Sequence, residues 1–163
     1  MIGRFMHGLP TRPAFVIAVI LVVGSVAGYY FDRYRDCTFH ASLREQLYSS
    51  LKARLGETVS ISDIVPFKWA KLSILTDYQP LHKLPECPFG WDWSKQQRQA
   101  LIGQGVLNML VFSRLGDYPE YIDVHKQQIN FSDVEDSFTP ETARFLVAQQ
   151  GSNRKGLLLK PVR

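Results

Sequence analysis

Residues 13–31 read PAFVIAVILVVGSVAGYYF, and this stretch decides how the chain is organised. It contains no Asp, Glu, Lys or Arg, and its length of about 19 residues is close to the ~20 that an α-helix needs to cross the hydrocarbon core of a bilayer. Tyr29, Tyr30 and Phe31 end the stretch, and aromatic side chains are favoured where hydrocarbon meets water. We therefore expect a transmembrane helix over residues 13–31, with a short tail, residues 1–12, before it.

Two other interpretations of this stretch stay open. In a cleaved signal peptide, Arg4 and Arg12 would form the basic region, residues 14–23 the apolar core and residues 25–27 the cleavage site. Against this, the apolar residues continue past that site to Phe31, which favours a retained anchor. The stretch would also suit the buried core helix of a soluble protein.

Arginines flank the expected helix on both sides, at positions 4 and 12 before it and at positions 33, 35 and 44 after it. The positive-inside rule is therefore nearly balanced. A short acid-free tail followed by one apolar segment resembles a signal anchor, which favours a cytoplasmic N-terminus. We expect the part of the chain after Phe31 to lie on the other, extracytoplasmic side.

Gly24 and Gly28 form a GxxxG pattern within the expected membrane helix. Small residues four positions apart let two helix backbones approach closely, so this face is a candidate for a homodimer or for packing against another membrane helix. Glycine is also common in membrane helices that make no such contact.

The chain after the membrane segment, residues 32–163, has the size and composition of a single domain. Apolar residues make up 45% of the whole sequence, and no low-complexity tract indicates disorder. Residues 32–163 carry 17 basic and 15 acidic side chains, because only Arg4 and Arg12 precede them. This small excess of positive charge gives no support for nucleic-acid binding.

The patterning of residues 32–163 predicts an α+β domain with an antiparallel sheet and one or two helices. Large apolar residues recur every four positions between residues 39 and 55, which predicts an amphipathic helix over residues 38–55 that packs on the sheet. Gly56 follows, where a left-handed helix end is expected, and Ser94 is the expected N-cap of a short helix. Strands are expected over residues 59–62, 69–76, 106–112 and 118–124, and a final hairpin over residues 143–148 and 156–160.

Cys37 and Cys87 are the only cysteines in the sequence. In a cytosolic domain they would be ordinary buried thiols, whereas outside the cytoplasm one such pair is a natural single disulfide. Given the expected location, we expect the bridge, which would tie the base of the first domain helix to a proline-rich loop, residues 80–93. Closing a loop of this length would contribute roughly 3–4 kcal/mol to stability.

Two segments of the domain, ISDIVPFKWAKLSILTDYQP and GVLNMLVFSRLGDYPEYIDVHKQQINF, share a further pattern with other proteins. An aromatic-x-Trp strand ends near a Tyr, and an apolar strand, a glycine turn and a strand leading to a Phe follow. This pattern resembles a group of small uncharacterised bacterial proteins with an N-terminal membrane or lipoprotein anchor. The resemblance implies a bacterial, anchored α+β domain and no particular activity, and Ala70 stands where the group commonly has an acidic residue. The matching positions are Phe67, Trp69, Tyr78, Leu110, Phe112, Gly116, Tyr121 and Phe131.

No pattern of catalytic or metal-binding residues stands out in the sequence. His40, His82 and His125 are scattered, and together with the two cysteines they form loose pairs rather than the tight spacing of a zinc site. The sequence has neither a glycine-rich phosphate loop nor a G-x-S-x-G nucleophile motif. We therefore predict no metal, no cofactor and no enzymatic activity.

The partner site is predicted on two loops. The proline-rich loop carries three closely spaced aromatic residues, and tryptophans are enriched in interaction hot spots. A second, acidic loop would steer a basic partner. The alternative is that at least one of the tryptophans closes the core. The residues assigned to the site are Phe89, Trp91, Trp93, Asp133, Glu135 and Asp136.

Together these features predict a single-pass protein of the bacterial inner membrane whose periplasmic domain binds another protein. A sharper version is an immunity protein that inhibits an envelope-acting bacterial toxin, which the small size, the tether and the missing catalytic signature favour. The alternative is an accessory or assembly subunit of a bacterial membrane complex, which would associate through Gly24 and Gly28.

Overall fold

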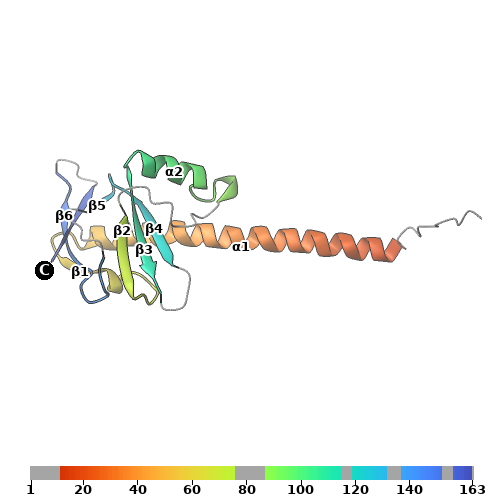
Figure 1. Cartoon of the computed structure of the whole chain (residues 1–163), viewed down its shortest axis with the longest axis horizontal. Helices are drawn as coiled ribbons and strands as arrows, with labels where there is room; N and C mark the ends of the chain where they lie inside the picture. Colours follow the sequence, from red (N-terminus) through yellow and green to blue (C-terminus); the bar gives the residue numbers. More distant parts are fainter. Residues whose placement is uncertain (1–11, 76–86, 115–118, 132–136, 152–155, 163) are drawn as a thin grey trace, which may run out of the picture.

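The computed structural model describes residues 12–75, 87–114, 119–131, 137–151 and 156–162, and its longest element is helix α1, Arg12–Ala53. This helix of 42 residues joins the expected transmembrane helix to the expected first helix of the domain without a break (Figure 1). No glycine or proline occurs between Phe31 and Ala53, so nothing in the local sequence ends the helix there. The domain boundary expected at residues 31–32 therefore lies inside one continuous helix.

The N-terminal part of α1 projects away from the rest of the described structure (Figure 1). Every residue from 13 to 31 is exposed, and the helix is long and apolar enough to cross a membrane. Because none of this apolar stretch is buried within the chain, it is not a core helix, and that interpretation is excluded.

The C-terminal part of α1 packs into the domain through Leu43, Leu47 and Leu51, each at most 3% exposed. The expected apolar stripe also included Phe39 and Leu55, but these side chains are 42% and 51% exposed. A helix turns about 100° per residue, so a spacing of four drifts by about 40° at each step. Phe39, at the start of the stripe, therefore turns away from the core, whereas Leu55 lies in the turn beyond the end of α1, so only the middle of the stripe is buried.

Two sheets complete the described domain (Figure 1). One has the strand order β2-β3-β4 and is antiparallel throughout. The other has the order β1-β6-β7-β5, and in it β5 runs parallel to β7 while the remaining pairs are antiparallel. The strands are β1 Thr58–Ser60, β2 Lys71–Leu75, β3 Leu107–Ser113, β4 Glu120–His125, β5 Ile129–Phe131, β6 Arg144–Gln149 and β7 Leu157–Pro161.

The expected α+β class is confirmed, with differences in detail. The expected final hairpin forms as β6 and β7, whereas β5 was not expected from the sequence. A short 3-10 helix, η1 (Ile61–Asp63), takes the end of the strand expected over residues 59–62. A second one, η2 (Pro88–Gly90), lies in the proline-rich loop.

Helix α2, Lys95–Gly103, begins where the sequence predicts. Ser94 is its N-cap, and its hydroxyl accepts the backbone N–H of Gln97 at 3.2 Å. The Gln97 side chain in turn accepts the backbone N–H of Ser94 at 2.8 Å, which completes a capping box. This closed pair fixes the first turn of α2 and the direction in which its side chains point.

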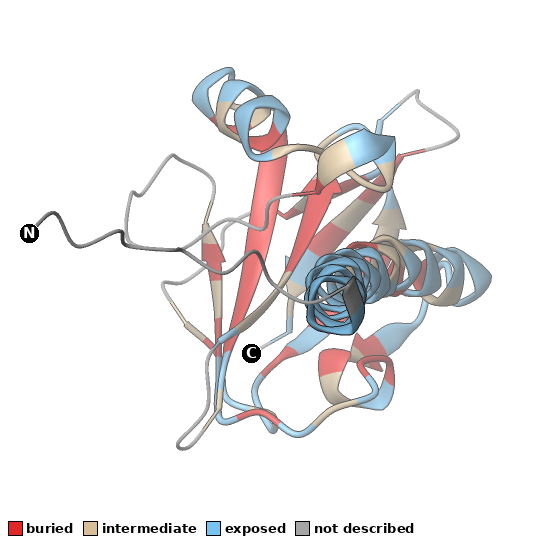
Figure 2. Ribbon diagram, turned by 90° about the vertical axis from the view of Figure 1, so that its right-hand side faces the viewer, coloured by how far each residue is buried: buried red, intermediate tan, exposed pale blue. Residues whose placement is uncertain are grey.

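Strand β3 is buried on both faces because it is the central strand of its sheet and is covered on each side (Figure 2). Leu110 and Phe112 face the main core, which contains the leucines of α1. Met109 and Val111 alternate with them and face a second, smaller core that includes Ile102 of α2. Phe67 and Trp69, just before β2, pack edge-on against Phe112 with ring centroids at 5.3 and 5.5 Å.

Candidate functional site

A ring of four charged side chains lies between α1, β4 and α2. Arg44 Nη2 donates to Asp92 Oδ1 at 2.9 Å and to Asp123 Oδ1 at 3.1 Å. From the other side, Arg98 Nη2 reaches Asp92 Oδ2 and Arg98 Nε reaches Asp123 Oδ2, each at 2.5 Å. Each guanidinium thus binds both carboxylates, and each carboxylate binds both guanidiniums. We call this set of four residues the ion ring.

The ion ring is shielded from water. The side chains of Arg98, Asp123 and Asp92 are 0%, 2% and 4% exposed, and that of Arg44 is 15% exposed. Arg44 Nε also donates to the backbone carbonyl of Asp123 at 2.9 Å, and Arg98 donates to the backbone carbonyl of Trp93. With two positive and two negative groups the ring is neutral overall, which makes its burial compatible with a stable fold.

The expected pair of cysteines forms a disulfide in the structure. Cys37 on α1 and Cys87 at the start of η2 are bonded, with Cα atoms 5.8 Å apart, and both are at most 2% exposed. The bridge reaches α1 only six residues after Phe31, the end of the apolar stretch. It therefore holds the segment after Cys87 against the part of α1 that leaves the domain.

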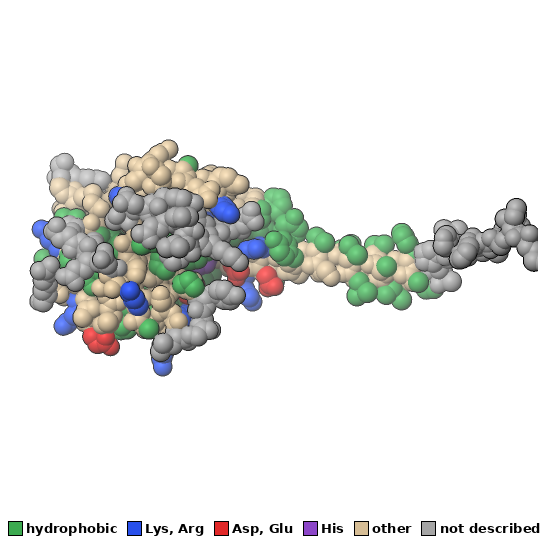
Figure 3. Space-filling view, in the orientation of Figure 1, with side chains coloured by type: hydrophobic (Ala, Val, Ile, Leu, Met, Phe, Trp, Pro, Cys, Tyr) green, Lys and Arg blue, Asp and Glu red, His purple; other side chains and the backbone are tan. Residues whose placement is uncertain are grey.

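Four aromatic side chains cluster where α1 leaves the domain. The ring centroid of Phe89 lies 5.7 Å from that of Tyr30, and that of Trp91 lies 5.2 Å from that of Tyr34. Phe89 and Trp91 also contact each other at 5.3 Å. Phe89 is 75% exposed and Trp91 is partly buried. Figure 3 shows hydrophobic side chains gathered at this junction. We call residues 88–91 the aromatic turn.

Trp93 is partly buried and packs on the second core rather than against the exposed part of α1. The guanidinium carbon of Arg44 lies 4.0 Å from the centroid of its ring, a close cation–π contact. The second core on which it packs includes Ile102 and Met109. The three aromatic residues that the sequence grouped into one partner site are thus divided: Phe89 and Trp91 lie against α1 near its exposed part, and Trp93 supports the ion ring.

The remaining predicted site residues are placed as follows. Asp133, Glu135 and Asp136 lie outside the described residues. Gly24 and Gly28 lie on the projecting part of α1, and a methyl group added at either would meet nothing within 4 Å. That face is therefore open in a single copy of the chain.

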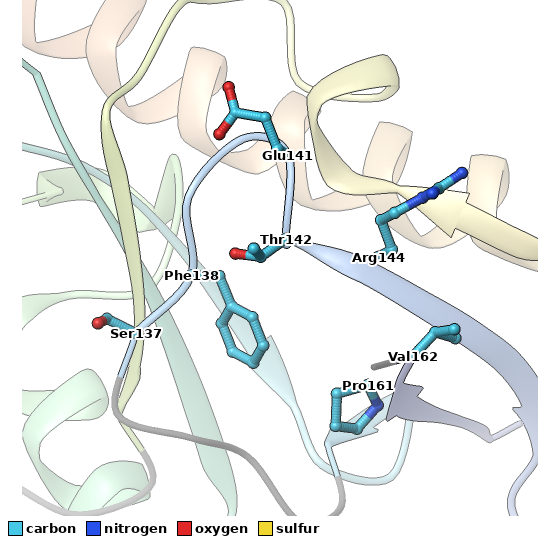
Figure 4. A pocket seen from close by; sticks show the side chains of 7 residues that line it. All are labelled: Ser137, Phe138, Glu141, Thr142, Arg144, Pro161 and Val162. Carbon is cyan, nitrogen blue, oxygen red and sulfur yellow. The ribbon is translucent and has the colours of Figure 1, made fainter.

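A pocket of about 520 Å³ lies at the end of the domain away from the projecting part of α1. It is lined by the turn that precedes β6 and by the end of β7. Figure 4 shows the Phe138 ring and Pro161 facing the hollow, whereas the charged groups of Glu141 and Arg144 extend outward. Its size falls within the range of ligand and side-chain pockets. The lining residues are Ser137, Phe138, Glu141, Thr142, Arg144, Pro161 and Val162.

The rim of this pocket carries an ordered carboxylate. The Thr139 hydroxyl donates to Glu141 Oε2 at 2.7 Å, and this bond, aided by the backbone N–H of Glu141, lowers the pKa of the Glu141 carboxyl. Glu141 thus remains ionised over a wider pH range than a free glutamate. The rim therefore presents a fixed negative group and, on β6, the positive group of Arg144.

His40 and Tyr121 form a stacked pair beside the ion ring. Their ring centroids are 4.8 Å apart and their planes differ by only 3°. His40 Nδ1 lies 3.1 Å from the backbone carbonyl oxygen of Tyr121, which only accepts, so this nitrogen carries the proton. Burial raises the pKa of the Tyr121 phenol above its usual range; Arg98 opposes this shift and Asp123 adds to it.

Among the described residues, no group of three or more His, Cys, Asp and Glu side chains is arranged to hold a metal ion. His82, one of the histidines considered in the sequence, lies outside the described residues. The clustered charges of the ion ring consist of ion pairs that satisfy one another. The arrangement is therefore suited to fixing the fold rather than to moving protons or binding a cation.

No protein-family model matches this sequence, and no curated protein or solved structure is significantly similar to it.

Proposed function

We propose that this chain is a membrane-anchored binding domain that faces an extracytoplasmic compartment and binds another protein. One observation carries the location: the exposed apolar part of α1 runs directly into a domain that is bridged by Cys37–Cys87 only six residues after that stretch ends. Disulfides form and persist mainly in oxidising compartments. A bacterial inner membrane with the domain in the periplasm suits both features.

The pocket supports the binding role. It lies at the end of the domain opposite the anchor, where a tethered domain presents its surface to other proteins. Phe138 and Val162 offer apolar contacts, and Glu141 and Arg144 supply charges of both signs at the rim. In sequence, Ser137 follows directly on the acidic residues Asp133, Glu135 and Asp136, to which we assigned partner steering. We therefore assign the partner to this end of the domain.

The side of the membrane is tested by thiol labelling. Ser49 is exposed on the domain part of α1, so Ser49→Cys introduces a reactive thiol while the native cysteines stay paired. A membrane-impermeant maleimide should label Ser49→Cys in intact bacterial spheroplasts. The matched variant Met6→Cys, in the tail before the membrane segment, should react only after lysis. The reverse pattern would place the domain in the cytoplasm.

The partner is tested by photo-crosslinking from the pocket. A photoreactive amino acid at Val162, which is 43% exposed, should crosslink one protein reproducibly, and the same residue at Ser49 should not. With that protein purified, Arg144→Glu should weaken binding at least tenfold, or ~1.4 kcal/mol or more. The control is Lys95→Glu, which makes the same change of charge at an exposed position of α2 and should leave the affinity within about twofold. If the two variants weaken binding equally, the partner does not bind at the pocket.

The sharper version of this function is an immunity protein that inhibits an envelope-acting toxin. The tether places the domain where such a toxin acts, and a small domain with an outward pocket suffices to block one. Cells that produce the cognate toxin, encoded beside this gene, should survive with the intact chain and lose protection with Arg144→Glu. An envelope-complex operon around the gene would instead favour the accessory subunit, with Gly24 and Gly28 as its helix contact.

A further inference from the structure

We propose that the aromatic turn, residues 88–91, rests in the interfacial layer of the membrane that α1 spans, with the Phe89 ring in contact with lipid. The inference rests on the anchoring of α1 proposed above. Contact of the aromatic turn with lipid would add to that anchoring a second point of membrane contact, which would fix the orientation of the domain on the membrane. The aromatic surface first assigned to a protein partner is thereby assigned to lipid.

The aromatic turn lies at the height along α1 at which the apolar stretch ends. With a rise of about 1.5 Å per residue, the stretch from Pro13 to Phe31 covers about 27 Å, nearly the ~30 Å thickness of the hydrocarbon core. Phe89 contacts Tyr30, one residue before the end of this stretch, and Trp91 contacts Tyr34, one helical turn further out. The aromatic turn therefore lies within about 6 Å of the hydrocarbon boundary, at the level of the lipid headgroups.

The aromatic turn is apolar and partly exposed. Phe89 is 75% exposed, and residues 87–91 contain no charged side chain. Phe89 adopts φ 57°, ψ 18°, a left-handed conformation that is uncommon for a bulky residue. The chain thus holds a phenylalanine out at a strained position beside a tryptophan. Aromatic side chains at the headgroup level are a recurrent feature of membrane proteins.

The aromatic turn is fixed to α1 at both ends. On one side Cys87 is bonded to Cys37, and on the other Asp92 is bound by Arg44 and Arg98 in the ion ring. The turn therefore cannot swing away from the helix when the helix enters a membrane. Because the Phe89 ring contacts the Tyr30 ring, the two rings lie at the same level of the membrane.

The charges of α1 agree with this placement. Asp32 and Arg35 lie on the first turn beyond the apolar stretch and form an exposed ion pair at 3.7 Å. Arg33, in the same turn, lies 5.5 Å above the ring of Tyr29. Charged groups thus begin one residue after Phe31, and the aromatic turn lies at the same height. A headgroup layer accommodates both kinds of side chain, whereas the hydrocarbon core accommodates only the aromatic ones.

The test measures depth in vesicles of phosphatidylethanolamine and phosphatidylglycerol that contain the full chain. Three single-cysteine additions, Phe89→Cys, Val26→Cys and Ser49→Cys, are labelled with the fluorophore NBD while the native pair remains oxidised. Quenching by lipids that carry a nitroxide near the headgroup or deep in the acyl chain reports depth. We expect the label at 89 to be quenched at least twofold more by shallow than by deep nitroxides, the label at 26 to show the reverse, and the label at 49 to be unaffected.

The outcomes separate the inference from the proposed anchor. If no position is quenched, α1 does not span the membrane and both fail together. If the label at 26 is quenched and the label at 89 is not, the anchor stands and the inference is overturned, which returns the aromatic turn to a protein partner. Protection of Cys37 and Cys87 from alkylation in every variant verifies that the turn is still held against α1.

Discussion

Arg98 on α2 binds Asp123 on β4 through its Nε at 2.5 Å, and both side chains are buried. The contact orients α2 on the sheet and closes the ion ring that also holds Asp92 and Arg44. Buried ion pairs cost free energy to desolvate, so such a ring adds specificity more than stability. Removing one member, however, leaves a charge buried with too few partners.

We therefore expect Asp123→Asn and Arg98→Met each to lower the free energy of unfolding by roughly 3–5 kcal/mol. Because the two residues share one contact, the double variant should lose less than the sum, which a double-mutant cycle in denaturant would measure. Asp32→Asn breaks the exposed pair with Arg35 and should change stability by less than about 0.5 kcal/mol. Additive losses in the double variant would show that the ring does not act as a unit.

Substitution of Trp91, in the aromatic turn, and of Trp93, just after it, should lower stability by different amounts. Trp93 lies under the Arg44 guanidinium and packs on the second core, so Trp93→Ala should cost roughly 3 kcal/mol or more of stability. Trp91 makes an edge contact with Tyr34 at the surface, so Trp91→Ala should cost about 1 kcal/mol. Denaturant unfolding of both variants in detergent compares them directly, and equal losses would contradict the division between core and surface.

Much of the fold follows from local pattern. The alternation in β2, the apolar run of β3 and the cap at Ser94 were each sufficient to place an element. The three residues of β5 were too few to give a periodic signal, and their parallel partner β7 lies far along the chain. The continuity of α1 was visible only as the lack of a breaker between Phe31 and Ala53.

The ion ring was missed for a different reason. Its members stand far apart in the sequence, at positions 44, 92, 98 and 123, and charged residues are usually exposed, so nothing in their spacing groups them. One signal was available: Asp123 stands between two apolar residues, Ile122 and Val124, in β4. In the structure it pairs with Met109 in register and so faces the second core. A carboxylate in that position requires a buried cation, and Arg98 is the cation that α2 supplies.

The partly buried phenol of Tyr121 should make the folded domain less stable at alkaline pH. Burial raises the pKa of its phenol, so the folded state favours the protonated form. Its stabilising contribution is complete below the unfolded pKa of about 10 and is lost as the pH rises beyond it, by at most about 1.4 kcal/mol per pH unit. Urea unfolding between pH 8 and 11 should show a steeper loss in the parent than in Tyr121→Phe. Identical pH profiles would mean that the phenol is not held neutral by the fold.

Gly156 lies where β5, β6 and β7 meet, and the structure leaves no room there for a side chain. A Cβ atom added at this position would stand 2.8 Å from the backbone carbonyl oxygen of Gln127 and 2.6 Å from Gln150 Oε1. The contact with Gln150 is to the far end of a flexible side chain, whereas the Gln127 carbonyl belongs to the backbone before β5. We therefore expect Gly156→Ala to destabilise the domain by about 1–3 kcal/mol, the usual range for overpacking. Gly103, at the end of α2, has nothing within 4 Å of its added Cβ and no positive φ, so Gly103→Ala should stabilise by up to about 1 kcal/mol. Melting curves of both variants against the parent measure the difference, and a Gly156→Ala protein as stable as Gly103→Ala would contradict the close approach of β5 and β7.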